Sequence, residues 1–131
     1  MKLFIISLLF INPIIVYAYE ADRAISNLAS DYATCSAYYS LMAYGSENNK
    51  DARSNFNKVA QYAFFAASKL SNKRVTESRI ELDIKAMMKE IDYSFSNGAI
   101  LINKYGEYCK GIIDNPKARL QYWLDKKPKT G

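Results

Sequence analysis

Hydrophobic residues recur at intervals of three and four along almost the whole chain, and runs that alternate hydrophobic with polar residues are scarce. This spacing gathers apolar side chains on one stripe of an α-helix, whereas a strand would need alternation. The pattern therefore predicts an all-α fold. The first helix is expected over residues 21–44, before Gly45, a common helix stop. Its apolar stripe consists of Ile25, Leu28, Tyr32, Cys35, Tyr39 and Met42.

A second helix is predicted over residues 51–70, after a short polar turn at 46–50. This segment is rich in alanine, which favours a helix and lets a neighbouring backbone approach closely. Because the connection is short, the first two helices should lie antiparallel as a hairpin. The stripe expected to face the first helix contains Phe56, Val59, Ala60, Ala63, Ala66, Ala67 and Leu70.

The next segment keeps one helical phase through a sequence that normally marks a turn, Asn97-Gly98. A turn gives no reason for phase to persist, so the pattern favours one long helix near residues 76–113, kinked at Gly98. The alternative is two helices broken at Asn97-Gly98. The residues that keep the phase, each seven apart, are Ile84, Ile91, Gly98, Tyr105 and Ile112, together with Met88, Phe95, Ile102 and Cys109.

Asp114-Asn115-Pro116 predicts the end of that segment and the start of a short helix over residues 117–125, because proline is favoured at the first helical position after a capping residue. The remaining residues, 126–131, are polar and basic and are expected to form a disordered tail. The predicted fold is thus an antiparallel bundle of three to five helices within residues 19–125.

The N-terminus has the pattern of a secretory signal peptide covering residues 1–18. A short positive start is followed by an apolar run, and Val16-Tyr17-Ala18 fits cleavage after Ala18. The alternative is a retained membrane anchor, but Asn12 and Pro13 interrupt the run, which is shorter than the roughly twenty residues of a membrane span. We therefore expect secretion, with the periplasm of a Gram-negative bacterium as the favoured destination.

The two cysteines, Cys35 and Cys109, both lie in the predicted mature chain. Thiols oxidise in an exported protein, and each cysteine falls on an expected inward stripe, so a structural disulfide is predicted. A redox-active pair is the alternative. It would normally use a Cys-x-x-Cys spacing, which this sequence lacks.

The absence of histidine excludes more chemistry than any other count. Catalytic triads and dyads with an imidazole base, and histidine-ligated zinc, haem or di-iron, all need that side chain. The carboxylates Asp31, Glu77, Glu81, Glu90 and Asp92 resemble solvated helix faces, with partners such as Lys85 for Glu81. We therefore expect no catalytic residue, no metal site and no cofactor, although carboxylate-only catalysis stays the least favoured alternative.

Two surface features point to partner binding. Adjacent aromatic residues on a helix cannot all face one core, which suggests an exposed patch around Tyr38 and Phe65; tyrosines lining a small core are the alternative. The excess of positive charge behind the net +5 lies mainly in residues 117–131. It predicts either a solvated tail or a contact with an acidic partner or anionic membrane surface. That contact would use Tyr122, Trp123, Lys126 and Lys127.

Binding of nucleic acid is not expected, because the charge is confined to one end of an exported chain. The leading hypothesis is a non-catalytic envelope protein that binds a protein partner, as inhibitors, immunity proteins and accessory factors do. The alternative is a structural or chaperone-like envelope component that holds apolar ligands or clients. The sequence leaves the oligomeric state open.

Overall fold

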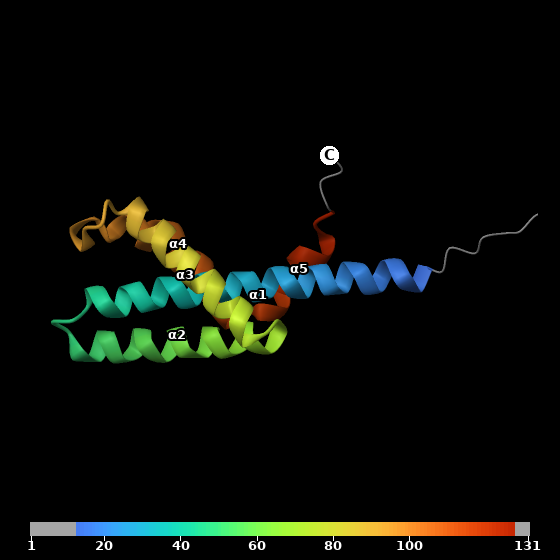
Figure 1. The fold of residues 1–131 in the computed structure, drawn as a ribbon, viewed down its shortest axis with the longest axis horizontal. Coiled ribbons are helices and arrows are strands. Elements are labelled where there is room, and N and C mark those ends of the chain that lie inside the picture. The colour runs from blue at the N-terminus through green and yellow to red at the C-terminus, as the bar shows by residue number, and fades with distance from the viewer. Residues whose placement is uncertain (1–12, 128–131) are drawn as a thin grey trace, which may run out of the picture.

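The computed structural model describes residues 13–127, and side chains from Tyr17 onward. These residues form five α-helices and one short 3₁₀ turn, so the all-α prediction is confirmed. Residues 1–12 and 128–131, which include most of the predicted signal peptide and the end of the predicted tail, lie outside the described range. The elements are α1 (Pro13–Gly45), α2 (Lys50–Leu70), α3 (Lys73–Glu90), η1 (Phe95–Asn97), α4 (Ala99–Asp114) and α5 (Pro116–Asp125) (Figure 1).

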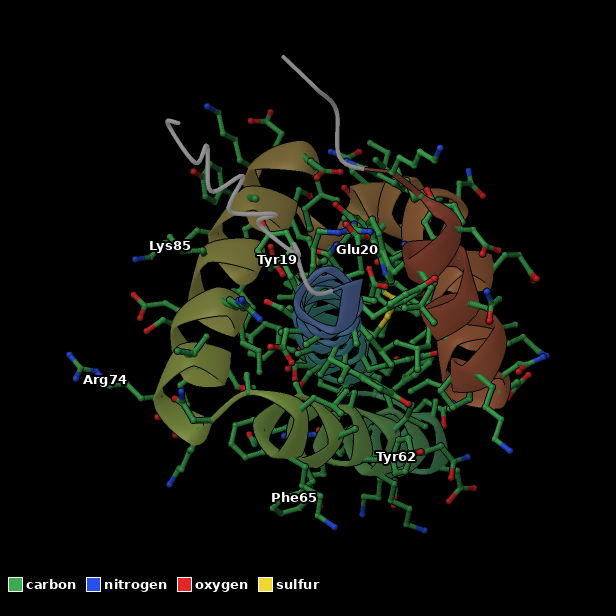
Figure 2. The ribbon with its side chains drawn as sticks, turned by 90° about the vertical axis from the view of Figure 1, so that its right-hand side faces the viewer. Tyr19, Glu20, Tyr62, Phe65, Arg74 and Lys85 are labelled. Carbon is green, nitrogen blue, oxygen red and sulfur yellow. A yellow bond between two sulfur atoms is a disulfide. The ribbon has the colours of Figure 1, made fainter. Side chains whose placement is uncertain are left out.

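Helix α1 is the axis of the molecule, with the other helices arranged around it. Viewed end-on, it lies in the centre, with α2 and α3 on two sides and α4 and α5 on a third (Figure 2). The single apolar stripe expected for this helix was therefore an incomplete description. Small residues let neighbours approach on several faces. Its buried residues from position 28 onward are Leu28, Ala29, Asp31, Tyr32, Ala33, Cys35, Ser36, Ala37, Tyr38, Leu41, Met42 and Ala43.

The N-terminal part of α1 extends beyond the bundle (Figure 1). It begins at Pro13, earlier than the predicted residue 21, and runs without interruption through the predicted cleavage site after Ala18. Tyr17 and Tyr19, on either side of Ala18, are both exposed. Removal of residues 1–18 would leave the buried part of α1 intact.

Helices α1 and α2 form the predicted antiparallel hairpin (Figure 1). The Asn49 side chain caps α2 by accepting a hydrogen bond from the Ala52 N–H at 3.0 Å. The Ser36 hydroxyl of α1 donates to the Ala60 carbonyl of α2 at 2.9 Å, across a seam where small side chains bring the two backbones together. The buried α2 residues of that seam are Ala60, Ala63 and Ala67.

The prediction of one long helix over 76–113 was wrong, because α3 ends at Glu90 and α4 begins only at Ala99. The Tyr93 N–H donates to the Met88 carbonyl at 2.8 Å and the Asp92 N–H to the Lys89 carbonyl at 3.0 Å. This is the paired bonding of a Schellman helix ending. Gly98, the expected turn residue, has helical dihedrals instead (φ −56°, ψ −24°).

Asp92 and Tyr93 supply the left-handed backbone of this ending, with φ values of 52° and 55°. The chain then folds back, and the Asn97 side-chain amide donates to the Ile91 carbonyl at 3.0 Å. The phase persisted in the sequence because both α3 and α4 pack on α1. Ile91 and Leu101 are buried on either side of the break, whereas Ile102, expected on the inward stripe, is 52% exposed.

Cys35 of α1 and Cys109 of α4 form the predicted disulfide, and both side chains are fully buried. The bridge spans 74 residues of sequence. In the chain-entropy model a loop of that length stabilises the fold by about 4.5 kcal/mol. Asn115 then caps α5 by accepting from the Ala118 N–H at 3.1 Å, with Pro116 at the first helical position as expected.

We predict that Tyr93→Gly stabilises the protein by about 1 kcal/mol, because glycine adopts φ = 55° without the steric penalty that a Cβ atom brings. Tyr93 is 69% exposed, so little packing is lost. Chemical denaturation would measure the change. Lys89→Gly, in the helical last turn of α3, is the matched control and should destabilise by about the same amount. Destabilisation by Tyr93→Gly would contradict the left-handed ending.

Candidate functional site

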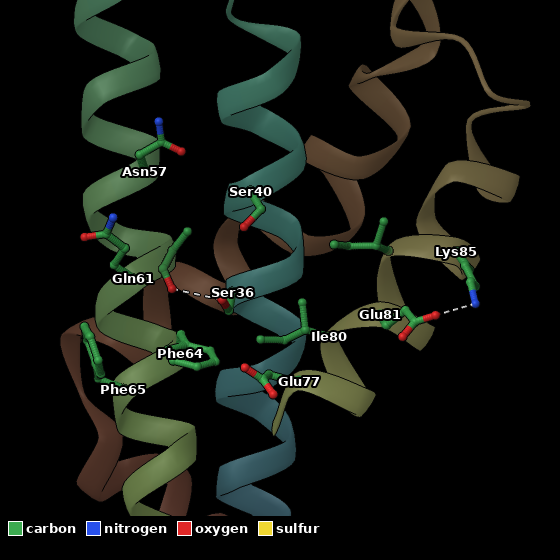
Figure 3. A pocket seen from close by; sticks show the side chains of 12 residues that line it. Ser36, Ser40, Asn57, Gln61, Phe64, Phe65, Glu77, Ile80, Glu81 and Lys85 are labelled. Carbon is green, nitrogen blue, oxygen red and sulfur yellow. Dashed lines mark hydrogen bonds and ion pairs between the residues drawn. The ribbon is translucent and has the colours of Figure 1, made fainter. Parts of the chain in front are cut away.

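The best candidate for a binding site is an open groove between α1, α2 and α3, with a volume of about 750 Å³ (Figure 3). The α2–α3 connection is only Ser71 and Asn72, so the two helices meet at that end and diverge from it (Figure 1). We call this hollow the α1–α2–α3 groove. Its lining residues are Ser36, Ser40, Asn57, Ala60, Gln61, Phe64, Phe65, Glu77, Ile80, Glu81, Ile84 and Lys85.

The floor and walls of the α1–α2–α3 groove differ in chemistry. Ser36 and Ser40 of α1 form a floor of small side chains, and Ser36 already donates its hydrogen bond to Ala60. The walls are apolar: Phe64 of α2 lies on one side, and Ile80 and Ile84 of α3 on the other (Figure 3). A ligand there would gain from apolar contact without leaving the Ser36 hydroxyl unsatisfied.

The rim that α3 contributes is charged but internally paired. Lys85 Nζ lies 2.7 Å from Glu81 Oε1, as the sequence pattern predicted, and Lys73 Nζ lies 3.7 Å from Glu77 Oε1. The hydrogen bond from Lys85 lowers the pKa of Glu81, so this carboxylate stays ionised at neutral pH.

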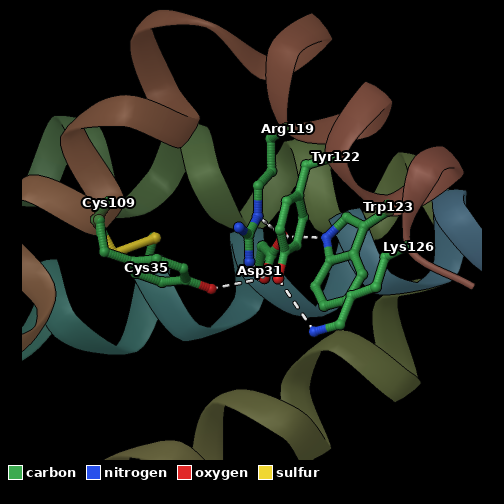
Figure 4. A network of polar contacts seen from close by, with 8 residues as sticks. Asp31, Cys35, Cys109, Arg119, Tyr122, Trp123 and Lys126 are labelled. Atoms are coloured by element: carbon green, nitrogen blue, oxygen red, sulfur yellow. Dashed lines mark hydrogen bonds and ion pairs between the residues drawn. A yellow bond between two sulfur atoms is a disulfide. The ribbon is translucent and has the colours of Figure 1, made fainter. Parts of the chain in front are cut away.

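A second polar cluster ties α5 to α1 around Asp31, which is buried rather than solvated as the sequence pattern suggested. Its carboxylate accepts hydrogen bonds from the Tyr108 hydroxyl at 2.6 Å, from Arg119 Nε at 2.6 Å and from Trp123 Nε1 at 2.6 Å (Figure 4). We call these four residues the Asp31 network. Every donor comes from α4 or α5.

The Arg119 guanidinium completes this arrangement by lying over aromatic rings. Its central carbon is 4.4 Å from the centre of the Tyr122 ring, 4.8 Å from Trp123 and 5.2 Å from Tyr108. Burial, and then the bond to Asp31, raises the pKa of Tyr108, so its hydroxyl stays protonated and keeps donating. The donors point inward at one carboxylate, so the Asp31 network holds α5 against α1.

The structure separates the residues expected to bind a partner. Tyr38 is only 4% exposed and packs against Tyr39 and Tyr105, so its assignment to an exposed patch was wrong. The reason is that α4 covers this face of α1, where the Tyr105 ring packs against Tyr38. Phe65, in contrast, is 61% exposed and lines the α1–α2–α3 groove. The adjacent pair Phe64-Phe65 was the sequence signal for this site.

The other four expected residues lie at or after α5, away from the groove lining. Trp123 is half-buried, and its indole N–H donates to Asp31. Its polar group therefore holds α5 against α1 and does not face the surface. Tyr122 is exposed, and Lys126 Nζ lies 3.0 Å from its hydroxyl. Lys127 is exposed at the end of the described chain. Sequence reasoning missed the contribution of Ile80 and Ile84 to a groove.

Within residues 13–127 no group of three or more potential metal-ligating side chains comes together. None of the described helices combines the length and the apolar character needed to cross a bilayer. Comparisons with known protein-family models, curated proteins and solved structures find no match to this chain.

We predict that Asp31→Asn lowers the free energy of unfolding by about 3 kcal/mol, because the half-buried Arg119 loses its counter-charge and the new buried amide faces three donors. Hydrogen exchange should accelerate in α5 more than in α2. Asp114→Asn is the control: it breaks an exposed pair with Lys110 and should change stability by less than about 1 kcal/mol. Equal effects of the two variants would contradict the anchoring role.

Proposed function

We propose that this chain is an exported, non-catalytic protein that binds a protein partner in the cell envelope through the α1–α2–α3 groove. The observation that carries the proposal is the groove itself, an open apolar hollow of about 750 Å³ on a small cross-linked bundle. Its walls expose apolar side chains from two helices over a floor of small residues, which is the surface that binding to another protein would cover.

Export is supported by two independent features. Residues 1–18 have the order of a signal peptide, and Cys35 and Cys109 are paired, which is typical of oxidising compartments. The buried Cys35–Cys109 disulfide is compatible with a periplasmic or extracellular location. The chemistry of the Asp31 network supports a non-catalytic role, because its carboxylate is saturated by internal donors.

We predict that the natural product begins at Tyr19 and carries no free thiol. N-terminal sequencing of the protein from the producing cell would show the start, and thiol titration after denaturation without reduction would count the sulfhydryls. The exposure of Tyr17 and Tyr19 leaves this part of α1 accessible to a peptidase. A product that starts at Met1 and is recovered reduced would contradict export.

We predict that Ser40→Trp lowers partner capture at least tenfold, because an indole on the floor fills the α1–α2–α3 groove. The mature protein would be used as bait in an envelope extract, and the proteins retained would be quantified for each variant. A tenfold loss corresponds to about 1.4 kcal/mol of binding free energy, which is less than the loss of a single central contact can cost.

The matched control carries the same new side chain outside the groove, as Asn103→Trp on an exposed position of α4. It should capture the same partner within twofold of the native protein, and both variants should show native circular dichroism. If the Ser40→Trp variant captures the partner as well as the native protein does, the groove is refuted as the binding surface. If the native protein captures many unrelated proteins and Ser40→Trp reduces the capture of all of them, the chaperone-like alternative is favoured.

A further inference from the structure

The dimensions of the α1–α2–α3 groove match one face of an α-helix. Its α2 wall runs from Asn57 to Phe65, about 12 Å at the helical rise of 1.5 Å per residue. A volume of about 750 Å³ over that length gives a mean cross-section of about 60 Å². A helix with its side chains is about 10–12 Å across, so the groove would hold roughly one face and leave the other in solvent.

The surface of the groove suits the close approach of another helix. Ser36 and Ser40 on the floor and Ala60 beside them are small, so a visiting backbone could come near α1. Phe64, Ile80 and Ile84 would meet side chains spaced three and four residues apart on the visitor. The visiting helix would then pack on α1 between α2 and α3, as the protein's own helices do elsewhere.

The charge around the groove is asymmetric. A hollow of about 400 Å³ along the N-terminal half of α2 shares Asn57 and Gln61 with the groove and is also lined by Lys50, Arg53 and Lys58. Among the described residues, none of these three cations has a carboxylate within ion-pair distance. The glutamates on the α3 rim, in contrast, are already paired.

From this geometry we infer that the occupant of the groove is an amphipathic α-helix of a protein partner, with acidic residues at one end of its apolar stripe. The inference rests on the proposed function and names its partner chemistry. The apolar stripe would cover Phe64, Ile80 and Ile84, and the acidic end would lie beside Lys50, Arg53 and Lys58. Helix-in-groove recognition of this kind uses anchors at positions i, i+3, i+4 and i+7.

The test places a photo-reactive amino acid, p-benzoylphenylalanine, at Gln61 and at Lys85, which line opposite walls of the groove and are both exposed. The full chain is expressed in the producing cell, irradiated, and the adducts are identified by mass spectrometry. Asn103, exposed on α4, carries the same label as the control. We expect both groove positions to label one protein, at residues that recur every three or four positions, and Asn103 not to label it.

Charge reversal adds a second measurement. Arg53→Glu and Lys58→Glu should each weaken capture of that protein about tenfold at low salt and less at high salt, because ionic strength screens exposed charges. Lys117→Glu, an exposed lysine of α5 outside both hollows, should leave capture within twofold. Equal effects of all three substitutions would overturn the proposed position of the acidic end.

The outcomes separate this inference from the proposed function. If the groove labels yield another protein that is labelled without helical periodicity, the helical occupant is refuted while the proposed function stands. Adducts of acyl-chain mass, or of a second copy of this chain, refute both the helical occupant and the protein partner. If Gln61 and Lys85 label nothing beyond what Asn103 labels, the groove is not a binding surface and both proposals fail. A single helical segment rich in acidic residues at one end supports both.

Discussion

The whole fold depends on the burial of the middle of α1, against which α2, α3, α4 and α5 all pack. A helix can be surrounded in this way only when its neighbours approach closely, and alanine, serine and cysteine at the contacts make that possible. Ala33, Ala37 and Ser36 are all almost inaccessible to solvent. The same constraint explains why a polar residue in this stretch must find internal partners, since an unpaired buried carboxylate would be strongly unfavourable.

Asp31 finds its internal hydrogen-bond donors on α4 and α5, and these bonds attach the C-terminal part of the chain to α1. Helix α5 has no fully buried residue, so apolar burial alone holds it weakly. Its position is set by donors to Asp31 and by Arg23, whose Nη2 donates to the backbone carbonyls of Trp123 and Lys126 at 2.9 and 2.8 Å. Helix α4 is fixed differently, through the disulfide from Cys109 to Cys35. The two anchors on α1 are one helical turn apart.

Local patterns in the sequence predicted most of the helices and the disulfide. The Asn115-Pro116 start of α5 and the alanine face of α2 depend on nearest neighbours and helical periodicity, and both agree with the structure. The break after Glu90 could not be predicted in the same way. Tyrosine rarely adopts the left-handed conformation that Tyr93 has, aspartate does so less readily than glycine, and the glycine that usually marks such a turn, Gly98, is helical.

The candidate site was less accessible to sequence reasoning than the fold. Tyr38 and Phe65 looked alike as aromatic residues beside another aromatic, yet one is buried and the other exposed. The difference comes from the faces on which they lie: Tyr38 faces Tyr105 of α4, whereas Phe65 lies on an exposed face of α2. Ile84 was expected on the apolar stripe of the segment that contains α3, but whether such a stripe is covered depends on the angle between α2 and α3, which no local pattern reports.

That angle follows from the same constraint as the rest of the fold. Only two residues connect α2 and α3, so the end of α2 and the start of α3 must lie close together. Asn72 caps α3 at this point by accepting a hydrogen bond from the Val75 N–H at 2.9 Å. Both helices also pack on α1. Because they diverge from their shared end, a gap is left between them, and the small residues of α1 form the floor of that gap. The groove is thus fixed by the frame and does not need a ligand to form it. A preformed apolar site loses less conformational entropy on binding, which favours affinity for a rigid partner such as a helix.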